Sequence, residues 1–309
     1  MCLSENPITA AHVKYQKELT DAGLLIPLGV PGLYGRSGVF EGIIEHFEAY
    51  VTRMGQHLNP EVMHFPPIIN RRAYLCTDHI EAFPNLMGSV HSFLGNDRDH
   101  IAMLEKKTQG EDWTNDLKPV EVMMAPAACY QLYPTATGIL PKGGRLVDLR
   151  SFVFRHEPSE DPARMQIFRM REFVRLGTAE QALEHRDYWL RRGKEILNAL
   201  GLDVQPVVAN DPFFGRGGRM MVATQKEQAL KYELIIAVAT AEKPTAISSC
   251  NLHLDHFSQA FGIKTSDGKI AHTACVGFGL ERTALALFKT HGFEPRDWPT
   301  DVKQALEMR

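Results

Sequence analysis

Charged and aromatic side chains in residues 155–172 have the types and spacing needed to bind a phosphorylated ligand. Arg155 and Glu157 are two residues apart, so on one strand they project from the same face. On a returning strand, four further side chains share one parity: Arg164, Phe168, Met170 and Glu172. Guanidinium groups grip phosphate oxygens, and an aromatic ring stacks on a base. The alternative is a solvated face with cross-strand salt bridges, although Phe168 would be unusual there.

A second candidate is the run CVGFGLERTALALF at residues 275–288. Gly277 and Gly279 allow close approach of the backbone, and Arg282 falls in the first turn of the expected helix. Taken alone, two glycines and a surface arginine are equally typical of helix packing.

The five cysteines are an odd number and widely spaced: Cys2, Cys76, Cys129, Cys250 and Cys275. We expect reduced thiols rather than disulfides, as in a cytoplasmic protein. Cys250 lacks a recognisable histidine and asparagine pattern that would make it a nucleophile.

A histidine-rich group near residue 255 is a rival metal site. His253 and Asp255 face away from His256 on a strand, so these side chains do not converge on one ion. We interpret them as ordinary polar or core residues.

The elements that position these side chains form an α+β pattern. Strands are expected at 146–155 and 166–176, joined by the polar turn HEPSEDPAR into an antiparallel hairpin. Helices are expected at 39–54 and 179–200, the second ending at Gly201. Further strands at 232–239, 246–254 and near Thr273 complete an antiparallel sheet flanked by helices.

Composition narrows the class of protein. The 309 residues are 44% hydrophobic and 23% charged with a net charge of −3, so no basic nucleic-acid footprint is present. No apolar stretch approaches the roughly 20 residues that span a membrane, and the first residues do not resemble a secretory leader. We expect a cytoplasmic protein without membrane association.

Taken in order, these segments resemble the signature motifs of class II aminoacyl-tRNA synthetases. FRHEPSEDPARMQIFRMREF resembles motif 2, and VGFGLERTALAL resembles motif 3. The helix from Val39, followed by Pro66-Pro67, is similar to the dimer-forming motif 1, and AISSCN is similar to a strand lining the ATP site of seryl-type enzymes. The resemblance implies a class II catalytic core over residues 1–309, with an N-terminal helical extension at 1–30, and a homodimer.

A narrower resemblance is to the amino acid:[carrier protein] ligases, truncated relatives of the atypical seryl-tRNA synthetases of methanogens. It is carried by PAACYQLYP, by the motif 2 segment and by the cysteine that precedes motif 3. It implies one zinc ion per subunit, held by Cys129, Glu172 and Cys275, with the open position taken by the substrate amino group. Two thiolates and a carboxylate are good zinc ligands, and three protein ligands leave a fourth position free.

The resemblance also implies a two-step reaction: ATP activates a small amino acid as its adenylate, which passes to the phosphopantetheine thiol of a carrier protein. Arg155 would hold the α-phosphate and stabilise the charge of the transition state. Glu157 would contact the adenine amino group and Phe168 would stack on the ring. Arg164 and Arg282 would bind the γ-phosphate and the pyrophosphate tail.

Magnesium is expected with ATP, but its ligands depart from the seryl-type pattern. Ser249 matches that pattern, whereas Ala246 stands where those enzymes have a magnesium-binding glutamate. Glu233 on the preceding strand is a candidate substitute.

The acceptor of the activated amino acid is inferred from the segments that lie outside the expected catalytic core. No segment is long enough for a tRNA-binding module, so we expect a carrier protein and no tRNA. A carrier-binding insertion is expected within 178–230, with two basic patches as candidate docks: Arg186, Arg191, Arg192 and Lys194, or Arg216, Arg219 and Lys226. Alternatives are a minimal tRNA ligase with a separate RNA-binding partner and a non-catalytic sensor of amino acid or nucleotide. The sequence does not decide between glycine and alanine.

Overall fold

The computed structural model describes residues 6–211, 214 and 228–308. Its α-helices are α1 (Pro7–Asp21), α2 (Gly38–Gly55), α3 (Arg71–Tyr74), α4 (His79–Ala82), α5 (Asp97–Gln109), α6 (Leu132–Thr135), α7 (Ala179–Asn198), α9 (His256–Phe261), α10 (Leu280–His291) and α11 (Thr300–Ala305). Five 3-10 turns are η1 (Gln56–Leu58), η2 (Pro84–Leu86), η3 (Thr114–Asp116), η4 (Ala128–Gln131) and η5 (Pro295–Asp297). In the described part of the chain, no helix is both long and apolar enough to cross a bilayer.

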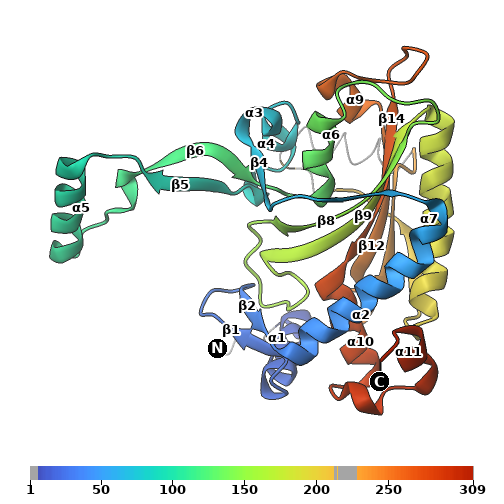
Figure 1. Cartoon of the computed structure of the whole chain (residues 1–309). Helices are drawn as coiled ribbons and strands as arrows, with labels where there is room; N and C mark the ends of the chain where they lie inside the picture. Colours follow the sequence, from blue (N-terminus) through green and yellow to red (C-terminus); the bar gives the residue numbers. More distant parts are fainter. Residues whose placement is uncertain (1–5, 212–213, 215–227, 309) are drawn as a thin grey trace.

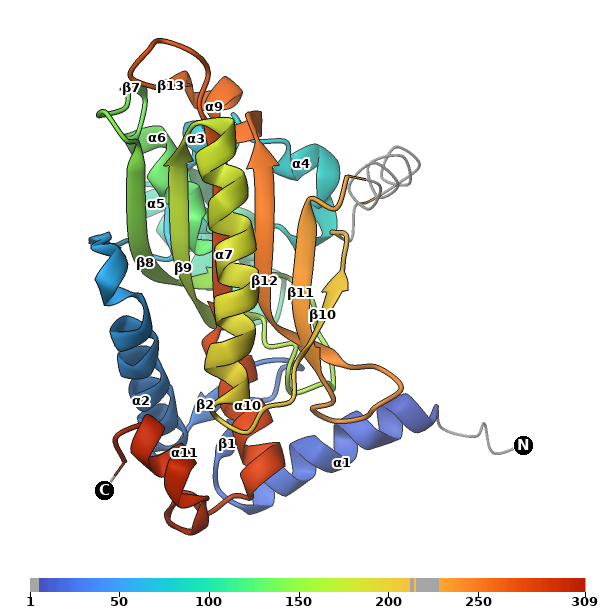
Figure 2. The same ribbon diagram turned by 90° about the vertical axis from the view of Figure 1, so that its right-hand side faces the viewer.

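A seven-stranded sheet forms the centre of the molecule (Figure 2). In spatial order its strands are β10 (Gln205–Val208), β11 (Lys231–Ile236), β12 (Thr245–Leu254), β14 (His272–Gly279), β9 (Ile167–Gly177), β8 (Arg145–Phe154) and β3 (Glu61–His64). Every neighbouring pair is antiparallel except β3 and β8. The α+β architecture expected from the sequence is confirmed.

The alternation of side chains along β9 gives the sheet two different faces. Odd-numbered residues meet helices: Arg169 and Arg171 hydrogen-bond α2, and Phe173 stacks on Trp189 of α7 with ring centroids 4.4 Å apart. The even-numbered Glu172 faces the other way and contacts Ala128 in η4. One face is therefore covered by helices, and the other is free to form a site.

The β8–β9 hairpin lies where the sequence predicts it, but its strands are shorter at the turn. β8 ends at Phe154 and β9 begins at Ile167. The expectation that Arg155, Glu157 and Arg164 lie on these strands is wrong. The chain turns after β8, where the Glu157 amide bonds the Arg155 carbonyl at 2.8 Å, and the Arg164 amide bonds Asp161 at 2.9 Å.

The N-terminal segment supports this turn from outside. The Gln166 amide donates to the Gly32 carbonyl at 2.8 Å. Gly32 has φ +76°, and a Cβ there would meet the Arg164 carbonyl oxygen at 2.9 Å, so only glycine allows this approach. In α1, Tyr15 donates to the Leu285 carbonyl of α10 at 2.6 Å. The expected extension, residues 1–30, is therefore packed on the core from α1 onward, and its strand β1 (Leu25–Pro27) pairs with β2 (Tyr34–Arg36), which follows it.

A smaller sheet carries an arm that projects away from the core (Figure 1). Its order is β4 (Ile68–Asn70), β6 (Leu117–Met124) and β5 (Ser89–Phe93), and α5 stands at its far end. Asn96 and Asp99 form a capping box at the start of α5, and none of its side chains is buried. A last pair, β7 (Gly138–Ile139) and β13 (Ile263–Lys264), is parallel.

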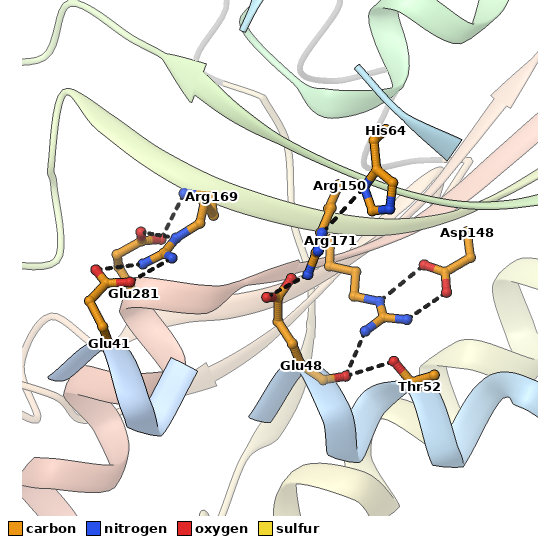
Figure 3. A network of polar contacts seen from close by, with 9 residues as sticks. All are labelled: Glu41, Glu48, Thr52, His64, Asp148, Arg150, Arg169, Arg171 and Glu281. Carbon is orange, nitrogen blue, oxygen red and sulfur yellow. Dashed lines mark hydrogen bonds and ion pairs between the residues drawn. The ribbon is translucent and has the colours of Figure 1, made fainter. Parts of the chain in front are cut away.

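A buried ion pair between β9 and β8 also hydrogen-bonds α2 (Figure 3). The Arg171 guanidinium donates to both Asp148 oxygens, at 3.0 and 2.5 Å, and to the Glu48 carbonyl oxygen at 2.6 Å. Arg171 and Asp148 face each other from β9 and β8 and are both buried. Water does not reach either side chain, so the Arg171 and Asp148 charges are each stabilised mainly by the other.

We expect Asp148→Ala to lower the free energy of unfolding by about 3–5 kcal/mol, because it leaves Arg171 buried and unpaired. Urea unfolding followed by circular dichroism measures the change. Asp297→Ala, at an exposed position in η5 whose side chain has no partner among the described residues, is the matched control and should leave the midpoint unchanged. Equal midpoints for both variants would contradict a structural role for the pair.

Candidate active site and metal-ligand cluster

Three residues from distant parts of the chain bring potential metal ligands together. One ligand atom each from Cys129, Glu172 and Cys275 lies within 4.8 Å of the other two, and all three residues are buried. Cys129 lies in η4, Glu172 in β9 and Cys275 in β14, where Gly277 pairs with Glu172. Strand order thus brings together the residues that the sequence suggests as ligands.

Glu172 has an incomplete set of partners. Its Oε1 accepts a hydrogen bond from the Ala128 amide at 2.9 Å, whereas the buried Oε2 has no partner among the described residues. Burial, with the nearby Cys275 sulfur, raises the pKa of Glu172 to about 8. A buried carboxylate oxygen without a donor is costly, and a metal ion would satisfy it. These residues therefore fit a cation with sulfur and oxygen ligands.

The two thiols differ in their surroundings. A hydrogen bond from Cys129, together with His253 and Asn251, lowers the pKa of Cys275 well below its usual value. His253 Nε2 lies 3.6 Å and Asn251 Nδ2 lies 3.4 Å from Cys275 Sγ. The same bond and burial raise the pKa of Cys129. One sulfur of the cluster is thus stabilised as a thiolate, which is the form that binds metals.

Arg155, Phe168 and Arg282 lie together beside this cluster. The guanidinium carbons of Arg155 and Arg282 lie 5.7 and 5.8 Å from the centroid of the Phe168 ring. Arg155 Nε donates to the Pro126 carbonyl at 3.1 Å, and Arg282 donates to the Ala163 and Ala246 carbonyls at 2.8 and 3.1 Å. Backbone acceptors therefore hold both guanidinium groups without neutralising their charge.

The arginines form a cluster of like charge. Burial, together with the charges of Arg155 and Arg164, lowers the pKa of Arg282 to about 10. Arg164 forms an ion pair with Glu157, which also faces this group. A polyanion such as a triphosphate would relieve this repulsion, and the Phe168 ring offers a stacking surface next to it.

Glu281, which precedes Arg282, has a structural role. It is buried and accepts hydrogen bonds from the Arg169 amide and Nε, at 2.7 and 2.8 Å (Figure 3). Arg169 also pairs with Glu41 of α2. The start of α10 is thereby fastened to β9 and α2, which fixes where Arg282 emerges.

The candidate magnesium ligands lie further along the same sheet face. Ser249 pairs with Gly277 on one side and with Glu233 on the other, so these positions face the same way as Glu172. Glu233 forms an ion pair with Lys231 at 3.4 Å. A Cβ at Gly277 would fit here in ordinary van der Waals contact, 3.6 Å from Glu172 and 3.8 Å from Ser249.

A cavity of about 630 Å³ extends from the metal-ligand cluster to the surface. Cys129, Glu172 and Cys275 line it together with Arg155. We call this cavity the deep pocket. Its size is within the range of pockets that bury drug-sized ligands, about 300–1,000 Å³.

His253 is a site residue that the sequence interpretation missed. It lines the deep pocket and contacts Cys275, and its Nδ1 lies 3.1 Å from Thr273 Oγ1. Its parity with Ser249 and Asn251 was the available signal. The inference that His253, Asp255 and His256 do not jointly hold a metal stays a prediction.

One proposed dock is partly wrong. Arg186 is buried and donates to the Ala229 carbonyl at 2.6 Å, so it is not part of an exposed patch on α7. The second dock, with Arg216, Arg219 and Lys226, lies outside the described residues.

Comparisons with known proteins show which family the chain resembles. The chain is 42% identical over 292 residues to amino acid--[acyl-carrier-protein] ligase 2 of Bradyrhizobium diazoefficiens, which covers 94% of this chain and 87% of that protein. It is 38% identical over 309 residues to ligase 1 of the same organism, covering 99% and 94%. No family model matches the chain.

Among solved structures, the M. kandleri seryl-tRNA synthetase, in complex with A. aeolicus tRNASec, superimposes with a TM-score of 0.81 at 20% identity. The match covers 95% of this chain and 60% of that one, so the chain spans less than two thirds of the synthetase. This likeness shows the class II synthetase fold. With the two near-full-length relatives, it follows that the chain belongs to the amino acid--[acyl-carrier-protein] ligase family.

Proposed function

We propose that this enzyme activates a small amino acid, glycine or alanine, as its adenylate and transfers it to the phosphopantetheine thiol of a carrier protein. The observation that carries the proposal is the position of the Cys129, Glu172 and Cys275 cluster beside the group of Arg155, Phe168 and Arg282. Arg155 links the two groups, because it lines the deep pocket together with the three ligands. An amine bound at one group and a phosphate at the other would bring a carboxylate and the α-phosphorus together.

The cluster would hold one zinc ion per subunit. Its sulfur, sulfur and oxygen donors and the unpartnered Glu172 Oε2 support this ion. When bound, the ion supplies a Lewis-acidic position that accepts a neutral amino group. His253 and Asn251 hold Cys275 from outside the ligand set, as residues next to metal ligands commonly do.

In the first step a carboxylate oxygen of the amino acid attacks the α-phosphorus of ATP, and pyrophosphate leaves. Arg155 would stabilise the charge that builds on the α-phosphate, and Phe168 would stack on the adenine. Arg164 and Arg282 would bind the β- and γ-phosphates, with Glu157 at the adenine amino group. Magnesium would accompany the triphosphate, near Ser249 and Glu233.

In the second step the thiol sulfur attacks the carbonyl carbon of the adenylate. The bond between this carbon and the phosphate oxygen breaks, and AMP leaves with the electron pair of that bond. The thiol proton passes to the departing phosphate or to solvent. The product is a thioester on the carrier.

The test is a competition between acceptors. The zinc-loaded protein receives ATP, magnesium, labelled glycine or alanine, a phosphopantetheine-bearing carrier and total tRNA together. We expect base-labile label on the carrier, and none when the carrier lacks its thiol arm. Label on tRNA would instead indicate a minimal tRNA ligase, and the absence of both label and ATP consumption would indicate a sensor.

The enzyme would act as a homodimer through α2 and β3, the elements similar to motif 1. β3 is an edge strand with Val62 67% exposed, and exposed apolar edges favour strand pairing. We expect sedimentation equilibrium to give twice the chain mass, and Val62→Lys to give one chain mass with unchanged circular dichroism. Val208→Lys, at a 45% exposed position on β10, the opposite edge strand of the sheet, is the matched control for added charge. A monomeric wild-type protein would contradict the dimer.

A further inference from the structure

The turn between β8 and β9 contains a buried carboxylate that has no part in the proposed reaction. Asp161 is 5% exposed, whereas the side chains of Arg164 and Glu157 in the same turn are 34% and 37% exposed. Burying a carboxylate is costly unless hydrogen bonds or opposite charges compensate it. The partners of Asp161 therefore indicate what it does in this turn.

Two partners of Asp161 lie within the turn. Its Oδ1 accepts a hydrogen bond from the Ala163 amide at 3.0 Å, and its carbonyl accepts one from the Arg164 amide at 2.9 Å. Its Oδ2 lies 3.8 Å from Arg164 Nε. The Ala163 carbonyl in turn accepts the hydrogen bond from Arg282 Nε at 2.8 Å. Asp161 thus fixes both the backbone that carries Arg164 and the carbonyl that holds Arg282.

A third partner comes from the N-terminal segment, which lies beside the turn (Figure 1). His12 of α1 is buried, and its Nε2 lies 3.6 Å from Asp161 Oδ2. At the other end of the turn, Gln166 Nε2 donates to the Pro31 carbonyl at 2.9 Å. The N-terminal segment therefore contacts the turn on both sides of Arg164.

These contacts concern one half of the nucleotide group more than the other. Arg164 and Arg282 are the residues proposed to bind the β- and γ-phosphates, and both are held by the turn. Phe168 lies on β9, and Arg155 is held by the Pro126 carbonyl, which lies outside the turn. Donors that are fixed before the ligand arrives need no reorganisation when it binds. The fixed turn therefore favours the phosphate tail and matters little to the adenine and the α-phosphate.

We propose that Asp161 is a positioning residue for the phosphate tail of ATP, and that His12 makes the N-terminal segment part of the nucleotide site. The inference rests on the proposed function and adds how the chain holds Arg164 and Arg282. Asp161 and His12 act through these two arginines and bind no part of the nucleotide themselves. ATP should depend on the two positioning residues, and AMP, which lacks the β- and γ-phosphates, should not.

Calorimetric titration of the zinc-loaded enzyme with ATP or AMP, each with magnesium, tests this selectivity. We expect Asp161→Ala to raise the Kd for ATP about 5–100-fold, the range spanned by loss of one buried hydrogen-bonding partner. The Kd for AMP should stay within twofold of wild type, which also shows that the variant folds. In pyrophosphate exchange, the KM for ATP should rise to the same extent and the KM for the amino acid should not change.

Two further variants separate positioning from general stability. Asp161→Asn keeps an acceptor for the Ala163 amide and loses the charge, so it should recover part of the ATP affinity. Asp148→Ala is the matched control, because it removes a carboxylate that is also 5% exposed but lies on the helix-covered face of the sheet. It should leave the ratio of the two Kd values unchanged. Equal losses of ATP and AMP affinity in Asp161→Ala, or unchanged ATP affinity, would overturn the proposal.

A double variant tests whether His12 acts through Asp161. His12→Ala alone should weaken ATP binding selectively but less than Asp161→Ala, because the Ala163 bond remains. His12→Ala combined with Asp161→Ala should bind ATP as Asp161→Ala does, since residues that act as a unit are not additive. Multiplication of the two single effects would overturn the role of His12. Failure of the proposed function differs, because wild type would then bind no ATP or show no amino-acid-dependent exchange.

Discussion

Arg155→Ala is expected to lower the rate of amino-acid-dependent pyrophosphate exchange by about 10²–10³-fold, the usual cost of removing one donor that stabilises a transition-state charge. The Arg155 guanidinium lies 5.7 Å from the Phe168 centroid, and its Nε is held by the Pro126 carbonyl. Within the described part of the chain this is its one hydrogen-bonded donor, so the others remain available to the α-phosphate. The exchange assay measures the loss directly, with zinc, magnesium and saturating amino acid present.

Arg155→Lys separates charge from geometry. A lysine keeps the positive charge but lacks the planar fork that grips two oxygens at once, so we expect it to recover only part of the rate. Arg191→Ala, at an exposed position on α7, is the control for loss of one arginine. If Arg155→Ala kept an exchange rate within threefold of wild type, the residue would serve only to order the end of β8.

The position of Arg155 also shows the limit of the sequence interpretation. The alternation in 166–176 correctly separates Glu172 from Arg169 and Arg171, because strand geometry is set by the local backbone. Arg155 and Glu157 lie beyond the end of β8, in the turn that follows it, yet both face Arg282, so the predicted grouping is right although the strand expected to carry it ends at Phe154. That turn depends on Gly32 and the N-terminal segment, which are distant in sequence. A two-residue spacing does not reveal such contacts.

The metal-ligand cluster is predictable only through the resemblance. Cys129, Glu172 and Cys275 are far apart in sequence, and their convergence depends on β14 pairing with β9 and on η4 lying against β9. Neither pairing follows from periodicity. His253 was missed for a related reason. Its parity with Ser249 and Asn251 gives its face, but its neighbour Cys275 comes from β14, and the pairing of β14 with β12 does not follow from periodicity.

Buried cysteine also has an ordinary explanation, and Cys250 illustrates it. Cys250 is fully buried on β12, next to Asn251, yet burial raises its pKa and it is not among the cluster ligands. Cys275, on the neighbouring strand, differs because Cys129, His253 and Asn251 stabilise its thiolate. The chemical role of a cysteine therefore depends on the groups around its sulfur. Most of these groups come from distant parts of the sequence, so the residues next to the cysteine in the chain do not reveal them.

Cys275→Ser is expected to remove the bound metal and to abolish amino acid activation while nucleotide binding stays intact. A hydroxyl is a much poorer zinc ligand than a thiolate. Mutation of residues that support a metal ligand lowers metal affinity about 10–100-fold, and we expect loss of a ligand itself to lower the zinc affinity by more than that. Without the metal, no group fixes the amino acid, and the exchange rate falls to background. Elemental analysis of the purified protein measures the metal. Calorimetry with ATP measures nucleotide binding, which should persist because Phe168 and Arg282 are unchanged.

Cys250→Ser is the matched control, because it introduces the same buried hydroxyl on an adjacent strand outside the cluster. It should keep one metal ion per chain and most of the exchange rate. The two variants together distinguish ligand loss from a general defect in packing, since both replace a buried thiol by a hydroxyl. Full metal content and full exchange in Cys275→Ser would show that the ligand assignment is wrong. If ATP binding were lost together with the metal, the cluster and the nucleotide group would form one folding unit rather than two separable half-sites.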